Sequence, residues 1–182
     1  MPAQVVKTLI VVCGPTAVGK THFAIALAEK LHTEIISADS RQLYNEIPIG
    51  TAQPSTEELQ RVKHHFVGNL LLEEDYNAGM FERNALKLLE NLFQEHDSVV
   101  CCGGTGLYIK ALCEGLDDVP TANELIREQL TERLEHEGLE KLQCELQNLD
   151  PVHFEKMDVQ NPQRVIRALE VCLSTGKPFS SF

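Results

Sequence analysis

A stretch near the amino terminus has the residue types and spacing of a phosphate-binding loop. The pattern G-x-x-x-x-G-K-T is filled by Gly14, Pro15, Thr16, Ala17, Val18, Gly19, Lys20 and Thr21. Glycines in such a loop allow backbone N–H groups to face phosphate oxygens, while Lys20 reaches the outer phosphates and the Thr21 hydroxyl binds Mg²⁺. The pattern therefore predicts a site for a di- or triphosphate with Mg²⁺ as cofactor. The alternative is a plain strand-to-helix turn with a solvated lysine.

The segments on either side of this loop favour the phosphate site. An apolar run over residues 8–13 predicts a buried strand, and Phe23, Leu27 and Leu31 recur every four residues on one face of a predicted helix. The amino terminus of that helix adds a partial positive charge beside the loop. Strand, loop and helix together are the context in which this motif binds phosphate.

A second predicted strand ends in residues that could carry acid–base chemistry. Residues 34–38 form a short apolar run, and Asp39, Ser40, Arg41 and Gln42 follow at once. Ligands of open α/β sheets lie beyond the carboxyl ends of the strands, so Asp39 is expected next to the phosphate loop. The alternative for Asp39 is a helix N-cap, a common position for Asp and Ser.

A third predicted strand, residues 98–102, leads into the glycine-rich segment 103–106. Glycines there would allow a ligand to approach the backbone at the same sheet edge, although such a segment is more often only a turn. Strands that alternate with helices, such as the long helix predicted after Asn77, indicate a parallel, three-layer α/β domain over residues 1–120.

The remainder of the chain has the pattern of helices. Residues 121–160 carry ten acidic against four basic side chains and predict a helical insertion subdomain. Asp150-Pro151 and Asn161-Pro162 are each a cap residue followed by proline at the first helical position. Residues 161–182 are expected to return to the α/β core as a helix. Arg164 and Arg167 share a face of that helix, either to bind a ligand or simply as solvated surface residues.

Composition limits the possible functions. Lys and Arg total 16 against 27 Asp and Glu, a formal charge of −11, which argues against a general nucleic-acid surface. The six cysteines form no C-x-x-C pair, which favours a reducing, cytoplasmic compartment. No apolar run is long enough to cross a bilayer, so no membrane partner is expected.

Five stretches together resemble one family, the tRNA dimethylallyltransferases. They are residues 14–21, Ile36–Gln42, Ile49–Pro54, Gly103–Tyr108 and Asn161–Glu170. This resemblance implies a fold of class α/β: a P-loop NTPase-like parallel sheet flanked by helices, with a small helical insertion domain. Val18 departs from the serine that is common in the family, without an expected consequence.

The resemblance also implies an activity and a set of site residues. The activity is transfer of a dimethylallyl group from dimethylallyl diphosphate to N6 of adenine 37 in a tRNA anticodon stem-loop. Asp39, as base, and Thr105 would be catalytic, and Arg167 would join residues 14–21 in binding the diphosphate. The implied tRNA contacts are Asp39, Ser40, Arg41, Gln42, Thr105, Arg127, Gln163, Arg164, Val165, Ile166 and Arg167. A cytoplasmic monomer is expected.

Three other functions share some of these features. A small-molecule kinase would have the same loop but commonly an arginine-rich lid, whereas residues 121–160 are acidic. A GTPase would carry an Asn-Lys-x-Asp motif, which is absent from the sequence. An inert nucleotide-binding fragment is the third. Because the family continues beyond this length and the chain stops at the apolar Phe182, we expect a truncated chain that binds pyrophosphate or the donor. Since the formal charge of −11 leaves few cations for an RNA backbone, this chain should bind tRNA weakly and transfer poorly.

Overall fold

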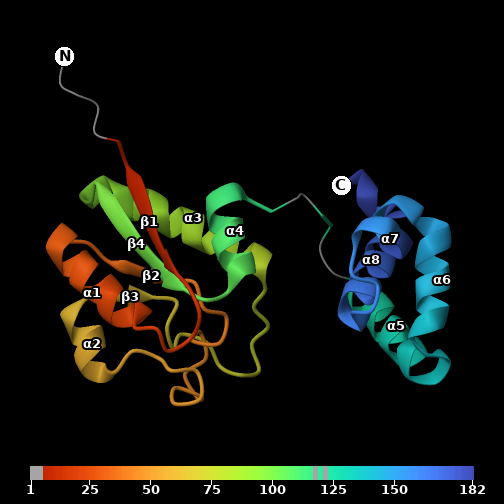
Figure 1. The fold of residues 1–182 in the computed structure, drawn as a ribbon, viewed down its shortest axis with the longest axis horizontal. Coiled ribbons are helices and arrows are strands. Elements are labelled where there is room, and N and C mark those ends of the chain that lie inside the picture. The colour runs from red at the N-terminus through yellow and green to blue at the C-terminus, as the bar shows by residue number, and fades with distance from the viewer. Residues whose placement is uncertain (1–5, 117–118, 121–122) are drawn as a thin grey trace. The chain divides into compact units, whose positions relative to one another are not determined.

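The structure is a computed structural model that describes residues 6–116, 119–120 and 123–182. The chain divides into two compact units, an α/β unit up to Leu116 and a helical unit from Asp117 onward. Figure 1 shows the elements of each unit. Within the described residues, no helix is both long enough and apolar enough to span a membrane.

The α/β unit is built on one parallel sheet with the strand order β1-β4-β2-β3. The strands are β1 (Thr8–Cys13), β2 (Ile35–Ser37), β3 (His64–His65) and β4 (Ser98–Gly103). The helices are α1 (Lys20–Leu31), α2 (Thr56–Arg61), α3 (Ala78–Glu95) and α4 (Gly106–Glu114). This arrangement confirms the predicted P-loop NTPase-like fold, a parallel sheet flanked by helices.

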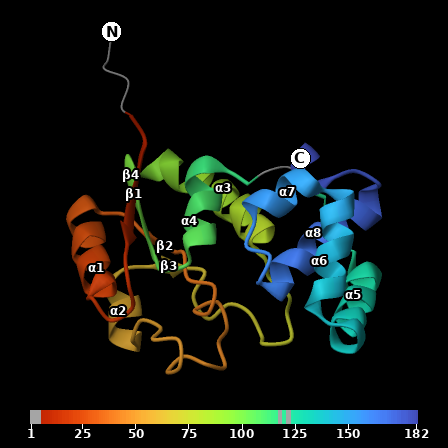
Figure 2. The same ribbon diagram turned by 45° about the vertical axis from the view of Figure 1, so that its right-hand side comes forward.

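Helices cover both faces of the sheet, with α1 and α2 on one side and α3 and α4 on the other (Figure 2). The alternation of side chains along each strand explains the two layers. Val99 and Cys101 of β4 pack with Phe81 of α3 in one apolar core. Val100, between them in sequence, packs with Ile25 of α1 in the other. The sheet is therefore packed between two apolar cores, and these fix the strand ends from which the loops begin.

Two strands differ from the sequence prediction. Within the described residues β1 pairs only with β4 and is half-buried, although its apolar run predicted a buried strand. Residues 64–72 end in an apolar run that could be one longer strand, but they form the two-residue β3 and an isolated bridge between Leu70 and Tyr44. Phe66 and Gly68 adopt left-handed backbone conformations with φ of 61° and 59°, which ends the strand ladder after two residues.

The helical unit packs around its own apolar core. Its helices are α5 (Glu124–Glu137), α6 (Leu139–Leu149), α7 (Pro151–Lys156) and α8 (Pro162–Thr175), followed by the 3₁₀ helix η1 (Phe179–Ser181). The predicted caps are confirmed: Asp150 accepts a hydrogen bond from the His153 N–H, and Asn161 accepts from the Gln163 N–H. Proline follows both caps at the first helical position.

Helix α8 belongs to this unit, which differs from the expected return of residues 161–182 to the α/β core. Leu169 and Val165 of α8 share a buried cluster with Leu130 of α5 and Leu142 of α6. The apolar face of α8 is therefore buried against neighbouring helices of residues 124–149. Periodicity in the sequence predicts such a face but does not identify the element that it contacts.

Candidate functional site

The backbone of the phosphate loop is arranged to receive an anion. Gly14 and Gly19 have positive φ values of 151° and 86°, conformations that L-residues rarely adopt. Gly19 is the N-cap of α1 and, without a side chain, supplies no cap hydrogen bond. The first N–H groups of α1 are thus left to a ligand, at the end of the helix that favours negative charge.

Lys20 and Thr21 lie in the first turn of α1, as the motif predicts. The Lys20 ammonium donates a hydrogen bond of 2.6 Å to the Pro15 carbonyl oxygen, so its side chain folds back over the loop. Thr21 is half-buried. Ala17, within the loop, has a φ of 66°, an unusual conformation for a residue with a Cβ.

The loops that follow β1, β2 and β4 meet at one sheet edge. A Cβ placed on Gly104 would lie 3.8 Å from the Gly14 carbonyl oxygen and 3.9 Å from Asp39 Oδ2. A Cβ on Gly103 would overlap the Ala38 carbonyl, so only glycine fits between β4 and the end of β2. The glycines after the third strand, a weak signal in the sequence, therefore bring the phosphate loop and Asp39 together.

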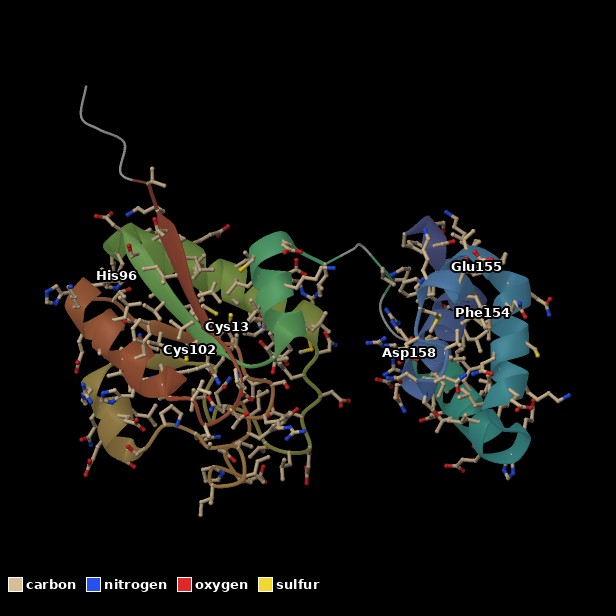
Figure 3. The ribbon with its side chains drawn as sticks, viewed as in Figure 1. Cys13, His96, Cys102, Phe154, Glu155 and Asp158 are labelled. Atoms are coloured by element: carbon tan, nitrogen blue, oxygen red, sulfur yellow. The ribbon has the colours of Figure 1, made fainter. Side chains whose placement is uncertain are left out.

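The Cys102 thiol lies near two charged side chains of opposite sign, Lys20 and Asp39. Figure 3 labels Cys102 on β4 and Cys13 on β1, the neighbouring strand. Burial raises the pKa of the Cys102 thiol, with the nearby Lys20 ammonium acting to lower it and the Asp39 carboxylate to raise it further. Lysine and carboxylate thus both lie within electrostatic reach of one thiol.

Asp39 is held by a turn and does not cap a helix. Its Oδ1 accepts a hydrogen bond of 3.0 Å from the Arg41 N–H, which forms an Asx turn over residues 39–41. The residues after Asp39 form turns in the structure, so the helix N-cap that the sequence left open is not formed. The other carboxylate oxygen, Oδ2, lies on the side of Gly104.

Thr105 and Ser40 are joined directly, although 65 residues separate them. The Thr105 hydroxyl accepts a hydrogen bond of 2.9 Å from the Ser40 N–H and donates one of 3.2 Å to Ser40 Oγ. The Thr105 N–H in turn donates to the Ala38 carbonyl oxygen at 3.1 Å. Three predicted site residues, Asp39, Ser40 and Thr105, therefore form one constellation beside the phosphate loop.

Arg41 and Gln42 differ in how free their side chains are. Arg41 is exposed. The Gln42 side chain accepts from the Ser37 hydroxyl at 3.1 Å and donates to the Ala52 carbonyl oxygen at 3.0 Å. Gln42 thereby fixes the loop of residues 47–53 against the end of β2, a structural role that the sequence did not suggest.

In the helical unit, two predicted site arginines contact one buried carboxylate. Arg127 of α5 and Arg167 of α8 both donate hydrogen bonds to Glu170, whose side chain is 1% exposed. No role for Glu170 was predicted from the sequence. Two signals mark it: a lone charge on the apolar face of α8, and its i+3 spacing from Arg167.

The predicted segment Gln163–Arg167 presents polar side chains on one side only. Gln163 and Arg164 are exposed, and Arg164 lies 3.8 Å from Asp158. A cavity of about 420 Å³ is lined by His153, Met157, Asn161, Gln163, Arg164, Arg167 and Phe179. Its lining combines the apolar Met157 and Phe179 with polar and charged side chains, which suits a partly polar ligand.

Val165 and Ile166, expected as tRNA contacts, have another role in the structure. They are 0% and 2% exposed and form part of the apolar core of the helical unit. At positions four and five of α8 they lie on the buried side of the helix, whereas Arg164 is exposed. Their side chains position the helix and do not reach its surface.

Comparison with known proteins assigns the chain to a family. A family model described as "IPP transferase" matches residues 42–182. The chain is 50% identical over 175 residues to tRNA dimethylallyltransferase 1 of Bacteroides thetaiotaomicron, covering 96% of this chain and 57% of that protein. It is 52% identical over 176 residues to tRNA dimethylallyltransferase of Cytophaga hutchinsonii, covering 97% of this chain and 58% of that protein.

A solved structure agrees with this assignment. A eukaryotic dimethylallyltransferase acting on tRNA is similar with a TM-score of 0.80 and 29% identity, over 96% of this chain and 44% of that one. The chain spans a little over half the length of the curated relatives that it matches. With the family match over residues 42–182 and half of all positions identical to these relatives, the chain belongs to the IPP transferase family.

Proposed function

We propose that this chain is the part of a tRNA dimethylallyltransferase that binds the diphosphate donor and the acceptor base. The observation that carries the proposal is the meeting of the phosphate loop, Asp39 and the Thr105–Ser40 pair at one sheet edge. This transfer needs a binding site for the diphosphate leaving group next to a side chain that accepts a proton. The names of the relatives support the same activity.

In the proposed reaction, the exocyclic N6 of adenine attacks the allylic carbon of dimethylallyl diphosphate. The new N–C bond forms as the C–O bond breaks, and pyrophosphate leaves with the bonding electron pair. The lone pair of this amine is delocalised into the purine ring, so a base that accepts the N6 proton assists attack. Asp39 is the proposed base, positioned by its Asx turn.

The charge on the leaving pyrophosphate is matched by the loop. Lys20 and the N–H groups at the start of α1 would donate to its oxygens, and Thr105 would hold Ser40 and Asp39 in register with them. Electrostatic stabilisation of this kind is commonly the largest single contribution to catalysis.

Mg²⁺ fits the loop as a proposed cofactor. Mg²⁺ commonly binds through one or two protein oxygens together with substrate phosphates and water, and the Thr21 hydroxyl is one such oxygen. The described residues offer no cluster of three His, Cys, Asp or Glu side chains that could hold a metal without phosphate. Bound there, the ion would neutralise charge on the pyrophosphate.

The proposed partner is the anticodon stem-loop of tRNA. Ser40 and Arg41 in the α/β unit, and Arg127, Gln163 and Arg164 in the helical unit, have polar side chains suited to an RNA loop. The target base must leave its stack, at a cost of a few kcal/mol, which a loop permits more readily than a duplex. A tRNA substrate supports action in the cytoplasm, and a monomer is the proposed oligomeric state.

Two assays on the same preparation test this function. Labelled dimethylallyl diphosphate is incubated with an anticodon stem-loop that contains the target adenine, and labelled ATP is incubated with small phosphoryl acceptors. We expect slow prenyl transfer to the stem-loop, because this chain should bind tRNA weakly, and no phosphoryl transfer. A stem-loop with guanine at the target position is the control for base specificity. Phosphoryl transfer would favour a kinase, and inactivity in both assays would favour an inert nucleotide-binding fragment.

A further inference from the structure

We propose that Glu170 is a positioning residue that holds Arg127 and Arg167 together as one RNA-binding pair. Its carboxylate contacts α5 and α8 at once: Arg127 donates through Nε at 3.1 Å and Nη2 at 2.9 Å to Oε2, and Arg167 donates through Nη1 at 2.9 Å to Oε1. The RNA-binding role of the two arginines rests on the proposed function. The contacts of Glu170 with them do not depend on that function.

The hydrogen bonds of the carboxylate are complete. Oε1 also accepts from the Asn123 N–H at 2.7 Å, so each oxygen accepts two N–H groups. Asn123 is the N-cap of α5, and its own side chain accepts from the Ile126 N–H. Glu170 therefore fixes both the start of α5 and the guanidinium one turn later. A carboxylate has about four lone-pair positions, so no further donor is needed to stabilise the buried charge.

Because the Glu170 carboxylate is buried, it must be paired with positive charges. Every other buried residue of α8 is apolar, and a charge at such a position is strongly unfavourable unless it is paired and hydrogen-bonded. The two arginines supply that pairing, and the carboxylate offsets the repulsion between their like charges. Since one negative charge faces two positive ones, the cluster retains a net charge of +1 in a unit that is otherwise acidic.

The arginines remain accessible to a ligand. Their side chains are 47% and 30% exposed, for Arg127 and Arg167 respectively, while Glu170 lies beneath them at 1%. Each guanidinium has five N–H donors and uses two of them here, since Arg167 also donates through Nη2 to the Pro120 carbonyl oxygen at 2.7 Å. Glu170 holds both guanidiniums in place, and their remaining N–H donors are suited to bind an RNA phosphate.

The first test measures whether Glu170 holds Arg127. In wild type, the Arg127 Nε–H should exchange slowly with solvent, as measured by NMR of the arginine side chains. Arg133, whose Nε donates to Glu137 at 3.1 Å in the same unit, is the internal reference. In Glu170→Gln we expect Arg127 exchange to rise ~10-fold or more while Arg133 is unchanged, because an amide group cannot accept all four donors. Unchanged Arg127 exchange would overturn the proposal.

Two further variants keep this test decisive. If Glu170→Gln also releases Arg133, the unit has unfolded, and Glu170→Asp, which keeps the charge but shortens the reach, replaces it. Glu170→Asp should raise Arg127 exchange to a smaller extent, and wild-type exchange in that variant would count against positioning. Glu155→Gln, which removes an exposed carboxylate of α7, should change neither signal (Figure 3).

The second test measures whether the pair serves RNA. At low salt, Glu170→Gln should weaken anticodon stem-loop binding ~10-fold, but should add no further loss when Arg127→Ala and Arg167→Ala are already present. An additive loss would mean that Glu170 acts on RNA binding by another route and would overturn the inference. Absence of binding by the wild-type chain would instead contradict the proposed function, while the Arg127 exchange rate still decides whether Glu170 positions the pair.

Discussion

The Thr105 hydroxyl accepts a hydrogen bond from the Ser40 N–H at 2.9 Å and so joins the loops that follow β4 and β2. Thr105 is the N-cap residue of α4, yet its side chain makes no cap hydrogen bond. Its hydroxyl is instead committed to Ser40, which also receives a second bond through Oγ. The Thr105 side chain therefore stabilises the site loops and does not cap helix α4.

Replacement of Thr105 should separate activity from stability. Thr105→Val keeps the shape but removes the acceptor, so stability should fall by only about 1 kcal/mol. Displacement of Ser40 and Asp39 should slow prenyl transfer ~10- to 100-fold, because small misplacements of reacting groups are costly. Thr105→Ser retains the hydroxyl and should be close to wild type in single-turnover assays. A loss in Thr105→Ser but not in Thr105→Val would mean that the methyl group, not the hydroxyl, matters.

Lys20 should be needed for pyrophosphate binding. Lys20→Ala removes a charged donor from the loop, and pyrophosphate affinity should fall ~10- to 100-fold, the usual scale for a hydrogen bond to a charged group. Isothermal titration calorimetry with pyrophosphate and Mg²⁺ measures the effect. Lys30→Ala, in the last turn of the same helix, is the matched control and should bind normally. Normal binding by both variants would place the diphosphate elsewhere.

Asp39 should affect the chemical step and not donor binding. Asp39→Asn keeps the size of the side chain and an oxygen for the Arg41 N–H, but it removes the proton acceptor. We expect single-turnover transfer to fall ~10²- to 10⁴-fold, as is typical when a general base is lost, with pyrophosphate affinity unchanged. A rate close to wild type would leave Asp39 with its turn-forming role alone.

Features that depend on neighbouring residues in the sequence were predicted well. The phosphate loop, the Asn77 and Asn161 caps and the two Asp/Asn-Pro helix starts follow from local backbone geometry and local hydrogen bonds, and the structure confirms the loop conformation and the caps. The meeting of the loops at one edge also follows, since the carboxyl ends of parallel strands share that edge.

Features that depend on distant contacts were predicted poorly. The apolar face of α8 was visible in the sequence, but the helices 124–149 that cover it were not identified. Val165 and Ile166 belong to that face, so membership of a motif did not distinguish the core residues from surface residues. The role of Glu170 could not be predicted, because its contact with Arg127 spans 43 positions and depends on α5 and α8 being neighbours.

Gly103 should be essential for the stability of the α/β unit. In Gly103→Ala the added methyl group would overlap the Ala38 carbonyl, and overpacking of this kind typically costs 1–3 kcal/mol. All three tyrosines lie in this unit and there is no tryptophan, so tyrosine fluorescence in urea reports its unfolding alone. Gly106→Ala, where a Cβ meets no atom within 4 Å at the start of α4, is the control. Equal urea midpoints for the two variants would contradict this account.

Asp150 should make the helical unit sensitive to acid. Its carboxylate accepts from the His153 N–H at 2.9 Å, the Ser180 N–H at 2.7 Å and the Ser180 hydroxyl at 2.8 Å, which ties η1 to the start of α7. Burial acts to raise the pKa of Asp150, but these hydrogen bonds outweigh it, and the pKa lies below the ordinary value of 3.8. The stabilisation is therefore complete above that pH and is lost as the pH falls through the lowered pKa of the folded state.

The acid titration of Asp150→Asn tests this. The asparagine cannot lose the interaction by protonation, so its helical circular dichroism should decline less between pH 4 and 2 (about the range set by the ordinary carboxyl pKa) than that of wild type. At neutral pH the variant should be less stable, because each carboxylate oxygen accepts from Ser180, so the amide N–H₂ that replaces either oxygen faces one of these donors. Glu155→Gln, an exposed carboxylate of the same helix, should titrate like wild type. Identical acid transitions in wild type and Asp150→Asn would mean that another carboxylate controls the acid sensitivity of the unit.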